Sequence, residues 1–443
     1  YSILGHLRYF GYYGIPEDSM EKFREVFNPY KYGHITELGI NEDGSSKLTK
    51  WYTLGRQAFE MSDMWPDGKV IFMSDDGKNC VFTAFVMDTP NDLSSGTLYA
   101  AKFHQLDDVN GGKFDITWIA LGSANQDDLV ALVEGLTFDM IFNTTDPSTP
   151  DSPDPVCPDG FTSVNTGGFG VECLMLMEGM ETAAAFFETR RYAAMMGATT
   201  ELSKFEGTAI VASANKMYGA ISEVREGMEN FARKGSYDPS YDYGGSNDIQ
   251  LPYGKCGCLY EISLEKIDGW MQPITWEGLV CGNTDYGTSE YDSCNVNSIS
   301  SPDNVYYMVC RFLRSSRFSS WNSHIFLTLL FWCSQGKAGS GINTLLVAED
   351  TDYHQNDYLW SYDLDSGEMT RLLTSVYGAE VTGAAYYEDG DGCSIFTAVI
   401  QHPYGETDQE RFNDTESTGK EGYVGYIGPI GNKGDVTSVG KSP

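Results

Sequence analysis

The sequence predicts an all-β protein, an irregular β-propeller with a few inserted helices. Its 48 glycines, 28 tyrosines and 13% aromatic content suit many short strands joined by tight turns better than a helical bundle. Short apolar runs that end in turn residues recur about every ten residues, which is typical of sandwiches, barrels and propellers. No strict repeat of roughly 40 to 50 residues is visible, so a propeller would be irregular. We expect residues 1–443 to form one domain.

The expected strands share a short apolar run closed by turn residues such as Asp, Gly and Ser. They cover residues 69–73, 80–86, 97–103, 114–119, 259–262, 359–364 and 369–373. Three segments have helical spacing instead: Glu17 to Phe27, Gln126 to Leu136 and Glu178 to Met196. The proline-rich stretch 146–155 predicts an exposed loop.

The charge of the chain excludes one class of partner. Lys and Arg total 29 against 63 Asp and Glu, a formal net charge of −34. Such a protein repels nucleic acids and anionic membranes, so we expect no nucleic acid partner. Most of the acidic excess is expected to be solvated surface, but calcium ligands can be part of it, since hard cations favour carboxylates.

Compartment signals are few. The chain starts at Tyr1 without Met or a signal peptide, so we expect a mature or N-terminally truncated product. Two sequons, at Asn143 and Asn413, would carry glycans in a secreted eukaryotic protein. No apolar run approaches the roughly 20 residues of a transmembrane anchor.

The ten cysteines show no zinc-binding spacing. Disulfides are expected to join Cys256 or Cys258 to Cys281 or Cys294, because all four lie in one loop-rich stretch. The sequence leaves the pairing open. With only six histidines, a metal would be held mainly by oxygen.

Residues 309–337 form an anomalous insert. The stretch is locally basic and, from Ile325 to Cys333, apolar without alternation. It separates two runs that a brief turn would otherwise join. We interpret it as a retained intron, because its ends allow GT and CAG codons; a buried core strand is the alternative.

Acidic, amide and histidine residues gather at strand ends between Ser301 and Glu406. The segments read SPDN, LLVAEDT, HQNDYLWSYDL and IQHPYGE. Loops on a rigid scaffold concentrate binding and catalytic groups, so these segments predict a polar centre that holds metal.

Several motifs together resemble the PhoX-type alkaline phosphatases, in particular their long-form branch. They are LGRQAFEMSDMWPDGKVIFMSDDG from Leu54, CLMLMEGMETAAAFFETRRYAAMMGATTELSKFEG from Cys173, SNDIQLPYGKCGCLYEI, SPDN, NTLLVAEDT and IQHPYGE. They occur in family order over most of residues 30 to 430.

The resemblance implies an irregular propeller whose centre holds iron and calcium ions and hydrolyses phosphate monoesters. It implies metal ligands at Glu60, Glu206, Asp303 and Glu349 or Asp350, with both members of the last pair retained as candidates. It also implies catalytic roles for Lys204 and Glu206. Lys204 stands where the family often has a phosphate-contacting arginine, and a lysine loses the bidentate geometry.

One family ligand has no counterpart. The iron-ligating cysteine expected upstream of Asn28 is absent, so it is lost or lies before Tyr1. Cys173 is the nearest later candidate. His402 fits a structural strand end as well as a site.

Each candidate also has a structural alternative. Glu60 and Glu206 could form ordinary ion pairs with Arg56 and Lys204. Asp303 could belong to an Asx turn, Glu349 and Asp350 could close a strand, and Asp363 to Gly367 reads more as a hairpin turn than as a calcium loop.

Two main functions fit these observations. One is a secreted, periplasmic or cell-surface metal-dependent phosphatase that acts on small-molecule phosphate esters. The other is a noncatalytic calcium-binding propeller in an extracellular or cell-surface assembly. A third, a lactonase-like propeller hydrolase with one calcium, fits the acidic residues but not the order of the motifs.

Overall fold

The computed structural model describes residues 27–149, 155–284, 292–309, 343–388, 394–405 and 422–430, with the single positions 8, 11 and 23. Of the predicted insert 309–337, only residue 309 is described. Asn413 and nearly all of the predicted helix 17–27 also lie outside the described residues. Strands dominate the described chain and helices are short, which confirms the all-β class.

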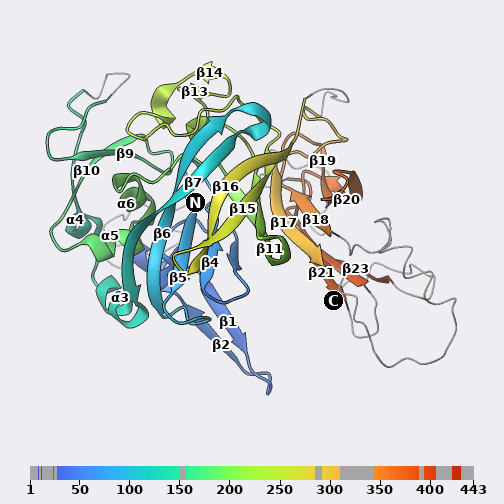
Figure 1. Cartoon of the computed structure of the whole chain (residues 1–443), viewed down its shortest axis with the longest axis horizontal. Coiled ribbons are helices and arrows are strands. Elements are labelled where there is room, and N and C mark those ends of the chain that lie inside the picture. The colour runs from blue at the N-terminus through green and yellow to red at the C-terminus, as the bar shows by residue number, and fades with distance from the viewer. Residues whose placement is uncertain are drawn as a thin grey trace.

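A nine-stranded antiparallel sheet forms the larger part of the molecule (Figure 1). Its order is β11 (Phe205–Val211), β12 (Lys216–Ile221), β15 (Cys258–Ile267), β16 (Trp270–Cys281), β7 (Lys113–Asn125), β6 (Ser95–Asp107), β5 (Thr83–Met87), β4 (Val70–Met73) and β3 (Ser62–Met64). The two edges approach each other, since the Thr208 hydroxyl of β11 donates to Asp63 Oδ2 of β3 at 2.5 Å. The sheet therefore nearly closes on itself.

Two further antiparallel sheets lie beyond β11 (Figure 1). One contains β17 (Pro302–Val309), β18 (Asn343–Glu349), β19 (Asn356–Asp363) and β20 (Met369–Tyr377); the other contains β21 (Glu380–Glu388), β22 (Ser394–Gln401) and β23 (Tyr423–Ile430). β17 packs closely against β11 at Gly207, where a Cβ would lie 2.0 Å from the Asp303 carbonyl oxygen. Only glycine allows this approach, which brings both strands to one site.

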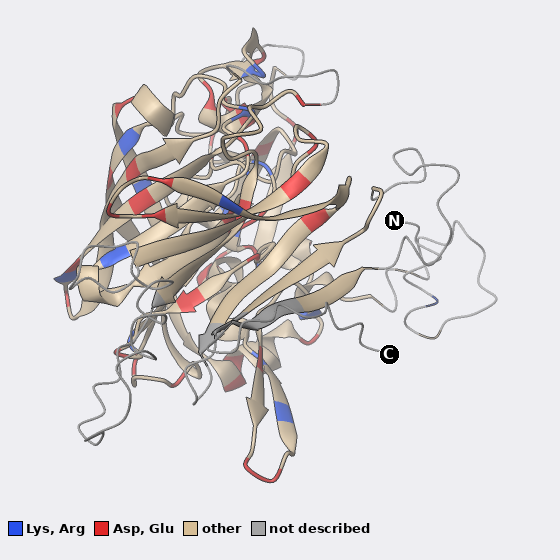
Figure 2. Ribbon diagram, turned by 90° about the vertical axis from the view of Figure 1, so that its right-hand side faces the viewer, with Lys and Arg blue, Asp and Glu red and all other residues tan. Residues whose placement is uncertain are grey.

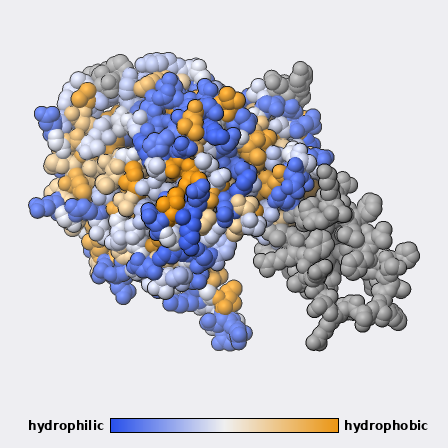
Figure 3. All heavy atoms as spheres, viewed as in Figure 1, coloured by the Kyte–Doolittle hydropathy of each residue, from blue (hydrophilic) through white to orange (hydrophobic). Residues whose placement is uncertain are grey.

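The remaining sheets are small. They are β1 (Thr36–Ile40) with β2 (Ser46–Lys50), β8 (Phe142–Thr145) with β10 (Val171–Leu176) and β9 (Thr162–Asn165), and β13 (Ala232–Arg233) with β14 (Ser236–Tyr237). The β1–β2 hairpin projects from the rest of the molecule (Figures 1 and 2), and hydrophobic residues appear on the projecting segment (Figure 3). Leu38, Ile40 and Leu48 are exposed there.

Four short α-helices and six 3-10 turns complete the described chain. The helices are α3 (Gln126–Val133), α4 (Phe138–Ile141), α5 (Glu181–Phe187) and α6 (Thr189–Met195); the turns are Pro29–Lys31, Tyr52–Leu54, Val109–Gly111, Ala212–Ala214, Glu226–Met228 and Pro239–Tyr241. The prediction for 126–136 is confirmed, with an earlier end. The single helix predicted over 178–196 is wrong in detail, because the chain leaves helical geometry at Glu188. The Glu188 carboxylate accepts from the Tyr30 hydroxyl at 2.8 Å, a long-range contact that helical spacing cannot show.

Aromatic side chains fill the interior of the nine-stranded sheet. Phe82, Phe205 and Trp276 are buried and meet one another edge to face, with ring centroids 5.2 to 5.9 Å apart. Such pairs add to the stabilisation from buried apolar area. A second core packs α3, α5 and α6 against the outer face of the sheet.

Three disulfides crosslink the described chain. Cys256 bonds to Cys294 and Cys258 to Cys281, which confirms the predicted set and settles its pairing. The third, Cys157–Cys173, was not predicted, and it makes the candidate role of Cys173 as an iron ligand wrong, because its sulfur is already bonded.

The ribbon carries many acidic positions and few basic ones (Figure 2), in keeping with the net charge of −34. None of the described helices has the length and apolar character that crossing a membrane requires.

Candidate functional site

A cavity of about 630 Å³ opens where β11 meets the starts of β17 and β21. Nine carboxylates line this pocket, together with three basic side chains and two histidines. The acids come from segments far apart in the sequence: Glu60, Asp76, Glu206, Glu223, Asp303, Asp350, Asp352, Asp357 and Glu380. Because acids outnumber bases three to one, the pocket favours cations over a bare anion.

The fold brings five of the six predicted site residues together. Glu60, Lys204, Glu206, Asp303 and Asp350 all line the pocket.

Glu349 does not line the pocket and is fully buried behind its wall. Its carboxylate accepts from the Ser300 amide at 2.9 Å, the Tyr358 amide at 3.0 Å and the Trp360 indole at 2.7 Å. The ring of His354 lies 3.1 Å from the second oxygen. With these partners the carboxylate braces the wall, and Asp350 is the member of the pair that faces the pocket.

Lys204 stands just before β11 and adopts a left-handed backbone, with φ of 48°. Its ammonium lies 3.0 Å from Glu206 Oε1 and 3.6 Å from Asp350 Oδ2. The other Glu206 oxygen accepts from the Ser222 hydroxyl. The ion pair considered for Glu206 is thus present, inside the pocket. Ser301 and His402, also in the lining, share the left-handed region; non-glycine residues held there cost of order 1–3 kcal/mol and cluster at functional sites.

Buried Asp75 holds in place the backbone segments that carry Glu60 and Asp76 to the pocket. The Asp75 carboxylate accepts from the Ala58 amide at 3.0 Å and from Arg190 Nε at 2.7 Å. The ion pair considered between Glu60 and Arg56 is wrong: the Arg56 guanidinium instead donates to the carbonyls of Pro29 and Tyr32.

Asp303 belongs to β17, so the Asx-turn alternative for it is wrong. The Asn304 side-chain amide donates to Asp303 Oδ1 at 2.9 Å, and Asn304 Oδ1 accepts from the Gly383 amide at 2.9 Å. These bonds tie the start of β17 to β21 and fix the direction of the Asp303 carboxylate.

The crowded acids perturb one another. Burial first, and then the charges of Glu380 and Asp350, raises the pKa of Asp303 well above its ordinary value. Burial likewise raises the pKa of Glu206, although Lys204 opposes it. Desolvation by the pocket wall, then Asp76 and Glu380, raises the pKa of Glu60. A cation placed among them would stabilise all three anions.

Burial lowers the pKa of Lys204, but the charges of Glu206 and Asp350 outweigh it, so the net shift is upward. The side chain therefore stays cationic in the alkaline range, as a phosphate contact requires.

Three side chains form a compact group of potential metal ligands. Ligand atoms of Asp350, Glu380 and His402 all lie within 4.8 Å of one another. His402 Nε2 is 3.1 Å from Glu380 Oε2, and its other ring nitrogen is 3.3 Å from the Gly378 carbonyl oxygen. Carboxylates suit calcium, and an imidazole among them suits a transition metal as well.

Sequence reasoning missed Glu380 and Asp357. Glu380 begins β21, three residues after Tyr377, where the acid at a strand start was the available signal. Asp357 lies in the HQNDY segment and is 2% exposed. One of its oxygens accepts from the Thr351 amide at 2.9 Å, while the other has no hydrogen-bond partner within the described chain. A buried oxygen left in this way is satisfied by water or a cation.

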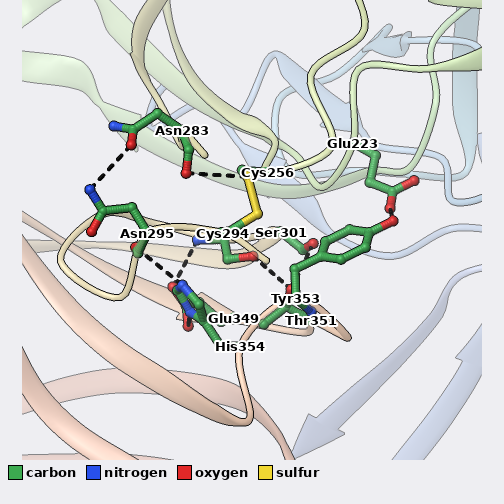
Figure 4. The surroundings of a disulfide bond; sticks show 11 residues. Glu223, Cys256, Asn283, Cys294, Asn295, Ser301, Glu349, Thr351, Tyr353 and His354 are labelled. Carbon is green, nitrogen blue, oxygen red and sulfur yellow. Dashed lines mark hydrogen bonds and ion pairs between the residues drawn. A yellow bond between two sulfur atoms is a disulfide. The ribbon is translucent and has the colours of Figure 1, made fainter. Parts of the chain in front are cut away.

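The Cys256–Cys294 disulfide anchors the wall of the pocket (Figure 4). Just beyond it, the Asn295 carbonyl oxygen lies 3.2 Å from His354 Nε2, and the Ser301 hydroxyl donates to Thr351 Oγ1 at 3.1 Å. Tyr353 extends from the same segment to donate to Glu223 (Figure 4). The crosslink therefore positions the segment 349–357 that supplies Asp350 and Asp357.

Arg225 is a second basic residue of the lining that sequence reasoning missed. One of its terminal nitrogens pairs with Glu223, while its buried Nε lies 3.9 Å from Glu226 Oε2 and has no hydrogen-bond partner in the described region. A guanidinium with a donor to spare suits an anionic oxygen.

A family model described as alkaline phosphatase PhoX matches residues 5–405 of this chain. Among solved structures, the chain is similar to Pseudomonas fluorescens PhoX in complex with vanadate, a transition state analogue, with 18% identity and a TM-score of 0.51. This likeness covers 89% of the present chain and 57% of the other, so the chain spans less than two thirds of that protein. It confirms the irregular propeller-like class.

Two structures of the AtxE2 isopeptidase, the S527A variant with bound Astexin3-dC4 and the apo form, match with TM-scores of only 0.13, at 9% and 8% identity. Each likeness covers 86% of this chain and 60% of the other, and neither carries an argument. No curated protein matches the sequence.

Proposed function

The chain belongs to the alkaline phosphatase PhoX family, and we propose that its acidic pocket hydrolyses phosphate monoesters with bound metal ions. One observation carries the proposal: nine acids from segments far apart in the sequence converge on one cavity, where ligand atoms of Asp350, Glu380 and His402 lie within 4.8 Å of one another. Phosphate ester hydrolysis needs cations that neutralise the phosphoryl oxygens and activate an oxygen nucleophile.

The donor set fits the two ions that the family resemblance implies. Glu60, Glu206, Asp303 and Asp350 offer the oxygen atoms that calcium prefers, and His402 adds a nitrogen that iron accepts. Glu380 and Asp357 extend this set. Because the Glu349 carboxylate is already hydrogen-bonded to residues of the pocket wall, we assign it a positioning role.

Lys204 and Arg225 are the proposed phosphate contacts. Both line the pocket, and their positive charges suit phosphoryl oxygens while carboxylates hold the cations. Glu206 would take part in both phosphate binding and metal binding. Its carboxylate lies 3.0 Å from the Lys204 ammonium, and it interacts with the charges of Asp303 and Asp76.

We place the protein outside the cytoplasm, in a secreted, periplasmic or cell-surface setting. The three disulfides support this, because such bonds persist in oxidising compartments. The proposed substrates are small-molecule phosphate esters.

The alternative is a noncatalytic calcium-binding module. It is favoured by the pairing of Lys204 with Glu206 and Asp350, which engages the ammonium within the protein.

Metal removal and reconstitution test the proposal. Protein dialysed against a chelator should lose hydrolysis of p-nitrophenyl phosphate and regain it with calcium plus iron. Glu206→Gln should lower kcat/KM at least about a hundredfold, the scale of losing a transition-state electrostatic group. Glu277→Gln, an exposed acid paired with Lys113, serves as the matched control and should act like wild type. Calcium uptake without turnover would favour the binding module.

A further inference from the structure

A second group of buried polar residues lies outside the pocket, around the loop 238–249 that follows β14, at the top of Figure 1. Its acids are Glu201 and Asp242, with 1% and 2% exposure, and its amides are Asn79 and Asn165, with 1% and 0%. None of the four lines the pocket. The group joins the β4–β5 connection, the end of β9 and the segment before β11 to one loop.

Asp242 is the centre of this group. Neither of its carboxylate oxygens has a hydrogen-bond partner of ordinary geometry in the described chain, although the Phe231 backbone amide is near enough to favour the charged form. Glu201 accepts from the Ser246 hydroxyl at 3.1 Å and from the Ile249 amide at 2.8 Å, but no Lys, Arg or His among the described residues forms an ion pair with Asp242 or Glu201. Burying a carboxylate without such partners is costly, so the site needs compensation from another source.

The two asparagines present oxygen rather than nitrogen to this group. Asn165 Nδ2 donates to the Ser240 and Tyr243 carbonyls, both at 2.8 Å, and Asn79 Nδ2 donates to the Tyr241 carbonyl at 2.7 Å. A flipped amide would set oxygen against a carbonyl oxygen, so the orientation is fixed. Both Oδ1 atoms are buried and have no hydrogen-bond partner in the described chain.

Two glycines mark where Glu201 comes near Asn79 and near the loop 238–249. A Cβ on Gly227 would lie 3.0 Å from the Glu201 carbonyl oxygen and 3.1 Å from both Nδ2 and Oδ1 of Asn79. A Cβ on Gly245 would lie 3.3 Å from the Asp242 carbonyl oxygen and 3.9 Å from Glu201 Oε1. Glu201 therefore borders both Asn79 and the Asp242 loop.

We propose that a calcium-class cation binds between Asp242, Glu201 and the amide oxygens of Asn79 and Asn165, and fastens the loop 238–249 to the body of the protein. Calcium takes carboxylate, side-chain amide and backbone carbonyl oxygens together, in flexible geometry. The ion would supply the positive charge that no described Lys, Arg or His provides to the two acids. This site is separate from the catalytic proposal and does not depend on it.

The electrostatics agree with this geometry. Burial, and then the charge of Glu201, raises the pKa of Asp242 to about 8. Burial, and then the charge of Asp248, raises the pKa of Glu201 to about 7. Both shifts have the direction expected where the protein alone disfavours two anions, and a bound cation reverses that preference.

Calcium counting with Asp242→Asn tests the site. After loading with Ca²⁺ and desalting, the variant should hold one equivalent less per chain than wild type. Asp238→Asn is the matched control, since Asp238 is a half-buried acid of the same loop that caps the turn by accepting from the Ser240 amide, and asparagine caps equally well. A double variant of the pocket, Asp350→Asn with Glu380→Gln, should keep this equivalent. Equal calcium content in Asp242→Asn and wild type, as for a pocket filled by water, would overturn the proposal.

Terbium gives a local readout. Tb³⁺ replaces Ca²⁺ at oxygen sites, and Tyr241 and Tyr243 flank Asp242, so excitation of tyrosine should sensitise its luminescence in wild type and in the pocket variant. The signal should fall in Asp242→Asn. A signal that disappears with the pocket variant and survives in Asp242→Asn would refute the assignment.

Hydrogen exchange on unaltered protein covers the case in which Asp242→Asn does not fold. Amides of residues 238–249 should exchange at least about tenfold more slowly in Ca²⁺ than in chelator. The exposed β1–β2 hairpin should show no change. Equal exchange of the loop in both conditions contradicts the site.

Discussion

Removal of the Cys256–Cys294 crosslink should damage the pocket as well as the stability of the fold. The double substitution Cys256→Ser with Cys294→Ser releases the segment 292–301 from the turn that precedes β15. That segment is held by the Ser301 amide, which donates to the Cys256 carbonyl at 3.0 Å, and by the Cys294 amide, which donates to the Tyr353 carbonyl at 3.1 Å. Both contacts lead to the wall that carries Asp350 and Asp357.

The expected loss of stability follows from the length of the loop that each disulfide closes. Cys256 and Cys294 are 38 residues apart, and Cys258 and Cys281 are 23 apart. The chain-entropy relation then gives a loss of about 4 kcal/mol for the first bond and about 3.5 kcal/mol for the second. The two disulfides therefore contribute nearly equally to the stability of the fold.

The two disulfides differ in the part of the molecule that each holds in place. Cys258 and Cys281 face each other on the paired strands β15 and β16, whose hydrogen-bonded ladder stays in place without the bond. Replacing that pair with serine should leave kcat/KM near wild type. The Cys256–Cys294 variant should lose about ten- to hundredfold in kcat/KM, because small displacements of positioned groups are expensive.

Urea unfolding without reductant measures the stabilities, and hydrolysis of p-nitrophenyl phosphate at saturating metal measures kcat/KM. Metal content of each variant separates a lost ion from a displaced one. If both serine variants lost activity equally, or if the Cys256–Cys294 variant kept full activity, the positioning argument would be refuted.

Two further predictions concern charge. Arg225→Met should raise KM and the inhibition constant of inorganic phosphate about tenfold, since a charge-assisted hydrogen bond is worth about 1.5–3 kcal/mol; Arg233→Met, at a 44% exposed side chain outside the pocket, should change either by less than about twofold, and equal effects would contradict the assignment. Asp63 is half-buried at the closure of the sheet, and desolvation there raises its pKa from 3.8 to about 6. The folded state thus holds the proton more tightly than the unfolded chain, so stability falls as pH rises from about 4 to about 6. Asp63→Asn should match wild type near pH 4 and exceed it by up to about 3 kcal/mol at pH 8 in urea unfolding. A constant difference across this range would show that Asp63 does not titrate as described.

Local patterns were sufficient for most strands. The runs at 69–73, 97–103 and 259–262 became β4, β6 and β15 because alternation and turn residues act over a few positions. The turn at Asp363 is likewise local, since the carboxylate accepts from the amides of residues 365 and 366.

Long-range contacts decided the rest of the fold. Neither the near closure of β3 on β11 nor the break at Glu188 follows from local spacing, because both depend on partners more than a hundred residues away. The disulfide pairing has the same origin, since four cysteines in one stretch permit several connectivities.

The sequence by itself determined the all-β class, the family and five of the residues that line the pocket. Only the tertiary structure decided between the neighbours Glu349 and Asp350. Successive side chains at the end of a strand point to opposite sides, so one of the two had to face the wall and the other the cavity. The order of the residues cannot say which side is which. That choice is made by Trp360, His354 and the amides that surround Glu349, and it leaves Asp350 beside Lys204, Glu380 and His402.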